Sequence, residues 1–266
     1  MGADIKALRV RIKSVDSTLH LTKAMGLVAS SKIRRAQEAM NAGRAYADAA
    51  ARVMHMLSGC RECSDSPYLK THGERTALVV IAGDRGLAGG YNSNIFRLVK
   101  ALEYDRIFPV GKRACDRYGG GTLTAEKFTY SQAQSLAQDL CDGILSGAFD
   151  KVGIVSTKYV SALSQTAQVQ WILPFAQSGE YARKGIIFEP NEQAVLLSAV
   201  PVYIAGALWG AVCESYACEV ASRRTAMDAA SKNAQQMIDG LQLEYNRARQ
   251  GSITQEITEI VSGSGI

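Results

Sequence analysis

Histidine is scarce in this 266-residue sequence. The three histidines are His20, His55 and His72, and neither a G-x-S-x-G nor an H-E-x-x-H pattern occurs in the chain. Without a histidine beside a nucleophile, or a pair of acids set around a cleft, no group of catalytic residues emerges. We therefore predict that the chain is not itself an enzyme.

Cysteine is also sparse. Six cysteines are spread along the chain, too few for a disulfide scaffold, which predicts reduced thiols in a cytosolic protein. Cys60 and Cys63 form one C-x-x-C pair, with His55 and His72 near it in sequence. A closed zinc site needs two more ligands, and no second pair has ligand spacing. A metal or redox role stays the less favoured alternative, and we expect no metal and no cofactor.

The glycine patterns of nucleotide-binding proteins are missing. The segment GDRGLAGGYN has the spacing G-x-x-G-x-x-G-G rather than G-x-G-x-x-G, and no acidic residue ends the next predicted strand to hold a ribose. No G-x-x-x-x-G-K-[ST] P-loop occurs. We interpret the segment as a structural turn whose glycines permit positive φ and close helix–sheet packing. Its residues are Gly83, Asp84, Arg85, Gly86, Gly89 and Gly90.

Targeting signals are not evident. The sequence opens with MGADIKALRVRIK, which has no apolar h-region and no good myristoylation pattern, so we expect no leader. One run, residues 194–213, has twenty residues without a charge and is long enough to cross a bilayer. Because Pro201 interrupts it and its flanks are acidic, we interpret it as a buried helix, broken near Pro201.

Strand and helix patterns alternate in the middle of the chain. Continuous apolar runs rich in β-branched residues predict strands buried on both faces, and helical segments separate them. This alternation predicts an α/β (Rossmann-like) domain with a largely parallel sheet. Strands are predicted at 76–82, 105–110, 151–157 and 167–173, and helices at 93–102 and 131–145.

Two long helical patterns enclose that domain. From Ile5 to Met40, eleven apolar or small residues follow a heptad without a break. Between Val220 and Ala248, small and apolar residues again recur three and four apart. Alternation of three and four is typical of a helix that packs along a partner helix. We predict that the two chain ends form a long antiparallel coiled coil, with domains at 1–60, 74–190 and 191–266.

Two details of the second helical pattern stand out. A second row of the repeat runs through Arg224, and an arginine in such a seam needs a specific reason. After Ala248 the repeat slips by about one position, to Ile253, Ile257 and Ile260. Such a slip changes the face that the helix presents. We predict that the last turns meet different surroundings from the rest.

The first helix is strongly basic. Between Asp4 and Arg35 it carries eight lysines and arginines against two acids, whereas the whole chain has a net charge of +5. A face of one sign suggests an acidic partner, either nucleic acid or an acidic protein sleeve. The helix has no Trp or Phe and only Tyr46 to stack on bases, so we favour a protein. A basic coiled coil that tethers nucleic acid or protein is the alternative.

Three separated segments resemble the γ subunit of F-type ATP synthases. They are the carboxy-terminal TAMDAASKNAQQMIDGLQLEYNRARQGSITQEITEIVSG, the amino-terminal LTKAMGLVASSKIRRAQ, and GDRGLAGGYN. They occur in the order of that family and cover both helices and the start of the α/β domain. From residue 100 to 220 the likeness is looser, apart from Phe188-Glu189-Pro190. The Cys60/Cys63 pair is a departure from the family pattern.

This resemblance implies a rotating central shaft. The coiled coil would sit inside an α3β3 ring and the α/β domain on a membrane-embedded c ring, with ATP made or hydrolysed on the β subunits. The implied partners are the α and β subunits, the ε subunit and the c ring, and no nucleic acid. Membrane association would arise only through the complex, at the cytoplasmic face of the bacterial plasma membrane.

The resemblance also implies roles for individual residues. Positions in the two helices match residues that contact the β subunits, although Met25 could simply pack. Two positions after the α/β domain match residues near the c ring and ε subunit. The implied β-subunit contacts are Lys23, Met25, Arg224, Arg249, Gln250, Thr254 and Glu256, and the implied c-ring and ε contacts are Phe188 and Glu189.

Overall fold

The computed structural model describes residues 2–70, 73–121, 123–176 and 186–263. The chain divides into two compact units. Unit 1 consists of Met1–Ala29 and Arg224–Ile266, and unit 2 of Ser30–Arg223. Helices α1 (Gly2–Ser58) and α5 (Glu192–Gly263) contribute residues to both units.

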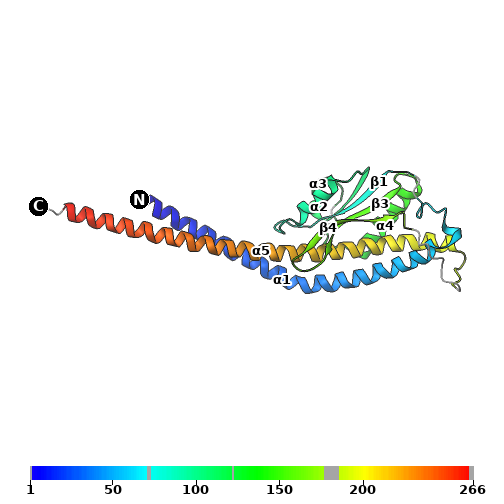
Figure 1. The fold of residues 1–266 in the computed structure, drawn as a ribbon, viewed down its shortest axis with the longest axis horizontal. Coiled ribbons are helices and arrows are strands. Elements are labelled where there is room, and N and C mark those ends of the chain that lie inside the picture. The colour runs from blue at the N-terminus through cyan, green and yellow to red at the C-terminus, as the bar shows by residue number, and fades with distance from the viewer. Residues whose placement is uncertain (1, 71–72, 122, 177–185, 264–266) are drawn as a thin grey trace. The chain divides into compact units, whose positions relative to one another are not determined.

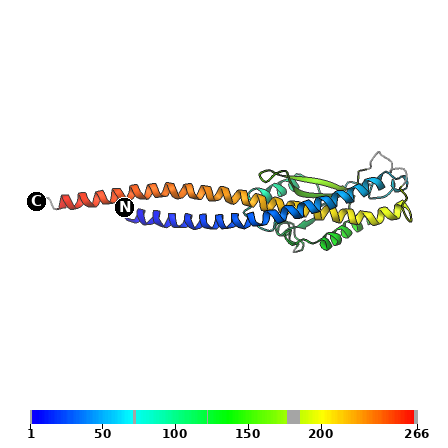
Figure 2. The ribbon, with the colours of Figure 1, turned by 90° about the horizontal axis from the view of Figure 1, so that it is seen from below.

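Unit 1 is an antiparallel pair of helices. Figures 1 and 2 show the starting part of α1 beside the final part of α5. Leu19 packs against Ala234 and Ile238, and the Ser231 hydroxyl donates to the Thr22 hydroxyl at 2.8 Å. Residues near the start of α1 therefore meet residues near the end of α5. This arrangement confirms the predicted coiled coil of the two chain ends.

Small residues let the two helices of unit 1 approach closely. A Cβ on Gly26 would lie 3.6 Å from the Met227 Cβ, so the helices touch at this level. The heptad pattern placed Arg224 in the seam between the helices, and this placement is wrong. Half of the Arg224 side chain (51%) is exposed, and its guanidinium lies 3.8 Å from Asp228. A charged head group stays in water while its stem lies along the helix.

Unit 2 contains a four-stranded sheet of order β2-β1-β3-β4. β1 pairs in parallel with both β2 and β3, and β4 pairs antiparallel with β3. The prediction of a largely parallel sheet is therefore right, with the last strand reversed at one edge. The strands are β1 (Thr76–Ile81), β2 (Arg106–Val110), β3 (Lys151–Tyr159) and β4 (Gln165–Leu173).

Helices cover both faces of this sheet (Figure 1). Because successive strand residues point to opposite faces, Ala77, Val79 and Ile81 join a core shared with α1, α4 and α5. Leu78 and Val80 join a smaller core shared with α2 and α3. The remaining helices are α2 (Tyr91–Lys100), α3 (Lys112–Tyr118), α4 (Tyr130–Leu145) and the 3₁₀ helix Arg61–Cys63.

The uncharged run at 194–213 belongs to one continuous helix, so the predicted break near Pro201 is wrong. A proline leaves the carbonyl four residues earlier without its helical donor. That carbonyl belongs to Leu197, which is exposed and can meet water. By length and composition α5 could cross a membrane, but 61% of its apolar window is buried, with Val200 and Ile204 in the larger core. The apolar run is therefore accounted for by packing within unit 2.

Candidate functional site

The turn segment Gly83–Gly90 lies where β1 ends and before α2 begins. This is the edge of a parallel sheet at which ligands commonly bind. Hydrogen bonds from a nearby side chain fix its backbone: Asn92 Oδ1 accepts the Gly83 N–H at 2.9 Å, and Asn92 Nδ2 donates to the Arg85 carbonyl at 3.3 Å. Asn92 therefore holds the backbone of the turn at both Gly83 and Arg85.

Asp84 gathers three backbone donors around one carboxylate. Its Oδ1 accepts N–H groups from Lys112 at 3.1 Å and Ala125 at 2.9 Å, and its Oδ2 accepts the N–H of Glu126 at 2.8 Å. Its own N–H donates to Glu219 Oε2 at 3.4 Å. Hydrogen bonds to an ionised acceptor are the stronger kind. Asp84 thereby ties the start of α3 and the segment before α4 to the end of β1.

A buried ion pair on α5 holds the same turn from the other side. Glu219 is 2% exposed and pairs with Arg223, whose Nη2 also donates to the carbonyls of Arg85 and Gly86 at 3.3–3.4 Å. A Cβ on Gly83 would lie 2.8 Å from the Glu219 carboxyl carbon, so a larger residue there would have to displace this carboxylate from its ion pair. Charges are tolerated in a protein interior when they are paired and hydrogen-bonded.

The turn glycines serve different purposes. Among the turn glycines only Gly89 has positive φ, at 56°, so the prediction that these glycines permit positive φ is right for one of them. Gly83 instead allows close packing against Glu219. Leu87 also has positive φ, at 60°, and is 62% exposed. A leucine in this region of backbone space is uncommon. Sequence analysis missed it, because nothing in the residue type signals the conformation.

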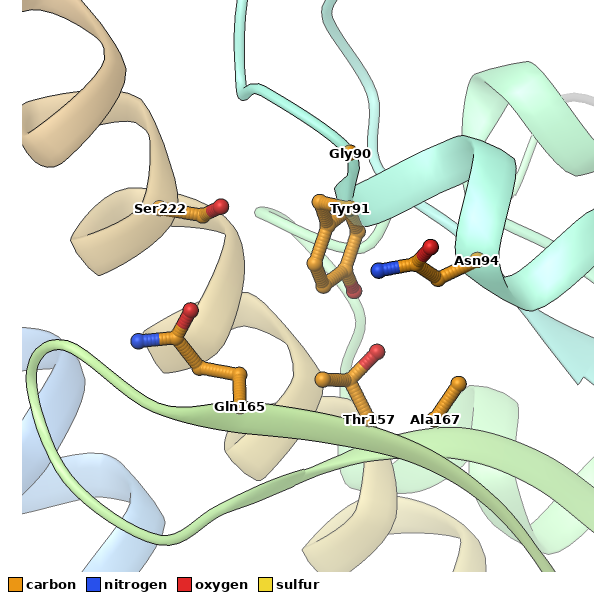
Figure 3. Close-up of a pocket in the computed structure, with 7 residues that line it drawn as sticks. All are labelled: Gly90, Tyr91, Asn94, Thr157, Gln165, Ala167 and Ser222. Carbon is orange, nitrogen blue, oxygen red and sulfur yellow. The ribbon is translucent and has the colours of Figure 1, made fainter.

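A small polar pocket lies beside the turn (Figure 3). It has a volume of about 60 Å³ and is lined by side chains of Tyr91, Asn94, Thr157, Gln165 and Ser222. A groove of about 400 Å³ between α2 and β4 shares the asparagine and the glutamine with it. Sequence analysis did not find this site, because its residues come from α2, β3, β4 and α5, far apart along the chain.

The residues implied as β-subunit contacts lie on unit 1. All are exposed except Met25, which is half-buried and so leaves both packing and contact open. Their visible contacts are local: the Thr254 hydroxyl donates to the Gln250 carbonyl at 2.9 Å, and Ser252 donates to Glu256 at 3.4 Å. The exposed set is Lys23, Arg224, Arg249, Gln250, Thr254 and Glu256.

The final turns of α5 present an apolar surface. Ile253, Ile257 and Ile260 are 46%, 56% and 68% exposed, unlike Ile238 further back in the helix, which is 6% exposed. The slip of the repeat after Ala248 therefore coincides with loss of the α1 partner surface. Exposed apolar side chains gathered at one place mark contact surfaces.

Phe188 and Glu189 lie just before α5 in unit 2. Phe188 is half-buried and packs against the larger core, while Glu189 is exposed.

In the described ranges, no group of three or more His, Cys, Asp or Glu side chains is arranged to hold a metal. Burial raises the pKa of Cys63 to about 11, with Cys60 and the nearby acids adding to the effect. A thiol with a raised pKa is a poor nucleophile at neutral pH.

Comparison with known proteins gives a consistent result. Residues 4–265 match the family model described as ATP synthase. The chain is 40% identical to the ATP synthase gamma chain of Ruminococcus albus and 39% identical to that of Desulforamulus reducens, over 98% of each chain. The fold resembles a chain of the Euglena gracilis mitochondrial ATP synthase rotor, with TM-score 0.67, 18% identity, and coverage of 95% and 100% of the two chains.

Proposed function

The chain belongs to the ATP synthase gamma-chain family, and on that premise we propose that it is the rotating central stalk of an F-type ATP synthase. It would couple ion flow through a membrane c ring to ATP synthesis or hydrolysis on the β subunits of an α3β3 ring. The observation that carries this proposal is unit 1, a helix pair with a closed inner seam and an outer surface of basic and apolar side chains.

The proposed mechanism needs no catalytic group on this chain. A shaft made of two unlike helices has no threefold symmetry, so it presents a different face to each of three equivalent β subunits. Each β subunit then favours a different conformation, because a contact shifts an equilibrium only when it differs between the two states. Rotation moves each face on to the next subunit. The ATP chemistry belongs to the β subunits.

We assign the contacts as follows. Arg249 and Gln250, with Arg224 and Thr254, meet the catch loop of a β subunit, where an arginine can form charge-assisted hydrogen bonds to carboxylates or carbonyls. Lys23 belongs to the region near the acidic β-subunit loop. The set is completed by Met25 and Glu256 towards the β subunits, and by Phe188 and Glu189 towards the c ring and ε subunit.

Membership of this family also supports association with a membrane-bound complex. We propose that the chain attaches to the membrane only through its partners, the α3β3 ring, the ε subunit and the c ring, at the cytoplasmic face of a bacterial plasma membrane. Nucleic acid is not among these partners, since the α1 segment of unit 1 carries no Trp, Phe or Tyr on which bases could stack.

Reconstitution with α and β subunits tests the proposal. The double variant Arg249→Ala/Gln250→Ala should assemble and lower ATP turnover at least about tenfold, the effect of losing one charge-assisted hydrogen bond of about 1.5 kcal/mol from the rate-limiting state. The control is Arg247→Ala/Gln242→Ala, which removes the same side-chain types from exposed positions on the same helix.

Three results can be told apart. Loss of turnover in the first double variant alone supports both the stalk and its contact residues. Assembly with unchanged turnover, or an equal loss in both double variants, keeps the stalk and removes the residue assignment. Folded protein that does not assemble with α and β subunits would overturn the stalk itself.

A further inference from the structure

We propose that Cys60 and Cys63 form a reversible thiol–disulfide site that locks the joint between α1 and α5. The two cysteines lie just after α1 ends, and Figures 1 and 2 show this end of α1 beside the start of α5. The site lies within unit 2 and uses no partner subunit, so it does not depend on the central-stalk role.

One tight turn brings the two cysteines together. Cys60 caps the 3₁₀ helix Arg61–Cys63, and the Cys63 N–H donates to the Cys60 carbonyl at 3.2 Å. Residues joined in this way across a turn have Cα atoms less than about 7 Å apart, and a disulfide spans Cα atoms about 4.4–6.8 Å apart. Side chains three residues apart in a 3₁₀ helix also lie on the same side. The turn therefore needs little backbone movement to close a disulfide.

The two thiols differ in their access to solvent. Cys60 is half-buried, and its Sγ donates to the Met56 carbonyl at 3.6 Å. Cys63 is 0% exposed and belongs to the larger core. An oxidant in solution therefore meets Cys60 first. This difference makes Cys60 the attacking thiol and Cys63 the thiol that resolves the product from within the protein.

The oxidant is a small disulfide of the glutathione type. The Cys60 thiolate attacks one sulfur of oxidised glutathione, which releases one glutathione thiolate and leaves a mixed disulfide on Cys60. The Cys63 thiolate then attacks Cys60 Sγ, forms the protein disulfide and releases the second glutathione thiolate. The two cysteine protons pass through solvent to the two released thiolates. The protein thus loses two electrons, and oxidised glutathione gains them.

The surroundings of the pair make both directions slow. A disulfide is reduced easily when a nearby charge lowers the pKa of a thiol and makes its sulfur a good leaving group. Here burial raises the pKa of both thiols, and the acids Glu62 and Glu192 raise them further. The disulfide therefore forms slowly at neutral pH, since little thiolate is present, and is also reduced slowly once it has closed.

The same turn holds the start of α5. Gln193 Nε2, in the first turn of that helix, donates to the Glu62 carbonyl at 2.8 Å. This hydrogen bond is lost when the turn opens by local unfolding. A disulfide between Cys60 and Cys63 restricts such opening, because it removes conformational freedom from the opened chain. Oxidation therefore locks the contact between Glu62 and Gln193, and reduction releases it.

Thiol counting on the full chain tests the site. Wild-type protein is incubated with oxidised glutathione at mildly alkaline pH, where more thiolate is present, and is then alkylated in denaturant. We expect two fewer alkylated cysteines than the six of the untreated chain. Trypsin cleaves after Arg61, between the two cysteines, so peptides 53–61 and 62–70 should stay joined until dithiothreitol separates them.

Three variants assign the roles of the two cysteines. Cys60→Ser should leave Cys63 free, whereas Cys63→Ser should stop at a mixed disulfide that adds one glutathione to Cys60. Cys115→Ser is the matched control and should still form the bridge, because Cys115 is another half-buried thiol whose pKa burial raises. Circular dichroism checks folding, and Cys60→Ser, outside the core, keeps the test decisive if Cys63→Ser does not fold.

Hydrogen–deuterium exchange on the wild-type chain measures the lock. The N–H groups of Cys63 and Ser64, both hydrogen-bonded within the turn, should exchange roughly tenfold more slowly in the bridged protein, the chain-entropy effect of closing a short loop. Joined peptides together with this slower exchange support the proposal. Six free cysteines after treatment, a bridge to any other cysteine, or equal exchange in the two states would overturn it.

Discussion

At the scale of single residues, Asp84 is the acceptor on which the turn at the sheet edge depends. Asp84→Asn replaces one oxygen by an NH₂ group, which cannot accept the N–H it would face. Keeping the oxygen on Lys112 and Ala125 leaves the Glu126 N–H without an acceptor. We expect a loss of about 2–3 kcal/mol in the free energy of unfolding, as for hydrogen bonds to charged groups.

Urea denaturation followed by circular dichroism measures that loss. Asp116→Asn is the control, because Asp116 is exposed and its ion pair with Arg113 spans 3.9 Å. An exposed change of this kind should stay within about 0.5 kcal/mol. Equal stability of the two variants would show that Asp84 does not hold the turn.

Glu126 predicts a pH dependence. The hydrogen bond from Lys32 lowers the pKa of the Glu126 carboxyl below its ordinary value of 4.5, although partial burial acts in the opposite direction. A lowered pKa in the folded state stabilises the fold above pH 4.5, and this stability is lost as the pH falls through the folded-state pKa. Glu126→Gln should therefore reduce the acid-side fall in unfolding free energy below pH 4.5.

Thermal unfolding across that pH range checks the sign. Glu38→Gln serves as the control, since the Glu38 side chain is 64% exposed and its partner Arg34 is 88% exposed, so solvent screens this pair. If Glu126→Gln leaves the pH profile unchanged, or steepens it, the Lys32 contact does not contribute as argued.

At the scale of elements, Gly43 and Gly210 mark a close backbone contact between α1 and α5 in unit 2. A Cβ on Gly43 would lie 3.1 Å from the Gly210 Cα, and a Cβ on Gly210 would lie 3.1 Å from the Gly43 carbonyl oxygen. Gly43→Leu should force the helices apart and lower the unfolding free energy by about 1–3 kcal/mol. Denaturant titration measures this loss.

Gly240 is the matched glycine in a helix interior. A Cβ there meets nothing within 4 Å, so Gly240→Ala should raise stability by about 0.5–1 kcal/mol through helix propensity alone. Opposite signs at the two positions would separate close packing from propensity. A stabilising Gly43→Leu would contradict the close contact.

Elements with a sustained pattern could be predicted from sequence. The strand predicted at 76–82 is β1, and the helix predicted at 131–145 is α4, because runs of apolar residues with one period leave few alternatives. α3 was missed, since its seven residues between glycines carry too few turns for a period. Pro201 was misjudged, because tertiary packing of its neighbours outweighs a local breaker.

The site could be predicted only in part. The turn that begins at Gly83 can be recognised in the sequence as a motif, but the residues that hold it in place cannot. Glu219 stands in a polar helical stretch and looks like a surface acid, yet it is buried because the turn and Arg223 surround it. The polar pocket beside the turn is likewise lined by residues of α2, β3, β4 and α5, which are far apart along the chain. Such facts arise from tertiary structure and have no local sequence signal.

At the scale of the whole molecule, the basic bias of α1 predicts salt-dependent assembly. Eight basic residues against two acids between Asp4 and Arg35 should steer the chain towards acidic partner surfaces. We expect its association rate with α and β subunits to fall as ionic strength rises, because salt screens exposed charges. Lys6→Gln/Lys13→Gln should flatten this dependence in stopped-flow measurements.

A control removes the same number of charges from unit 2. Lys100→Gln/Lys127→Gln changes two exposed lysines there and should leave the salt dependence close to that of the wild type. An equal change of slope in both double variants would mean that net charge alone, and not its place on α1, sets the rate.

The helix pair of unit 1 also has a consequence for biosynthesis. Its contacts join residues as far apart as Arg9 and Tyr245. The first helical segment to leave the ribosome therefore cannot pair until almost the whole chain has been synthesised. At roughly 5–20 residues per second, the 209 positions separating Thr22 from Ser231 take on the order of 10–40 s to translate. During that time the apolar seam of the nascent helix is open to chaperones, and any chain that terminates early keeps it open.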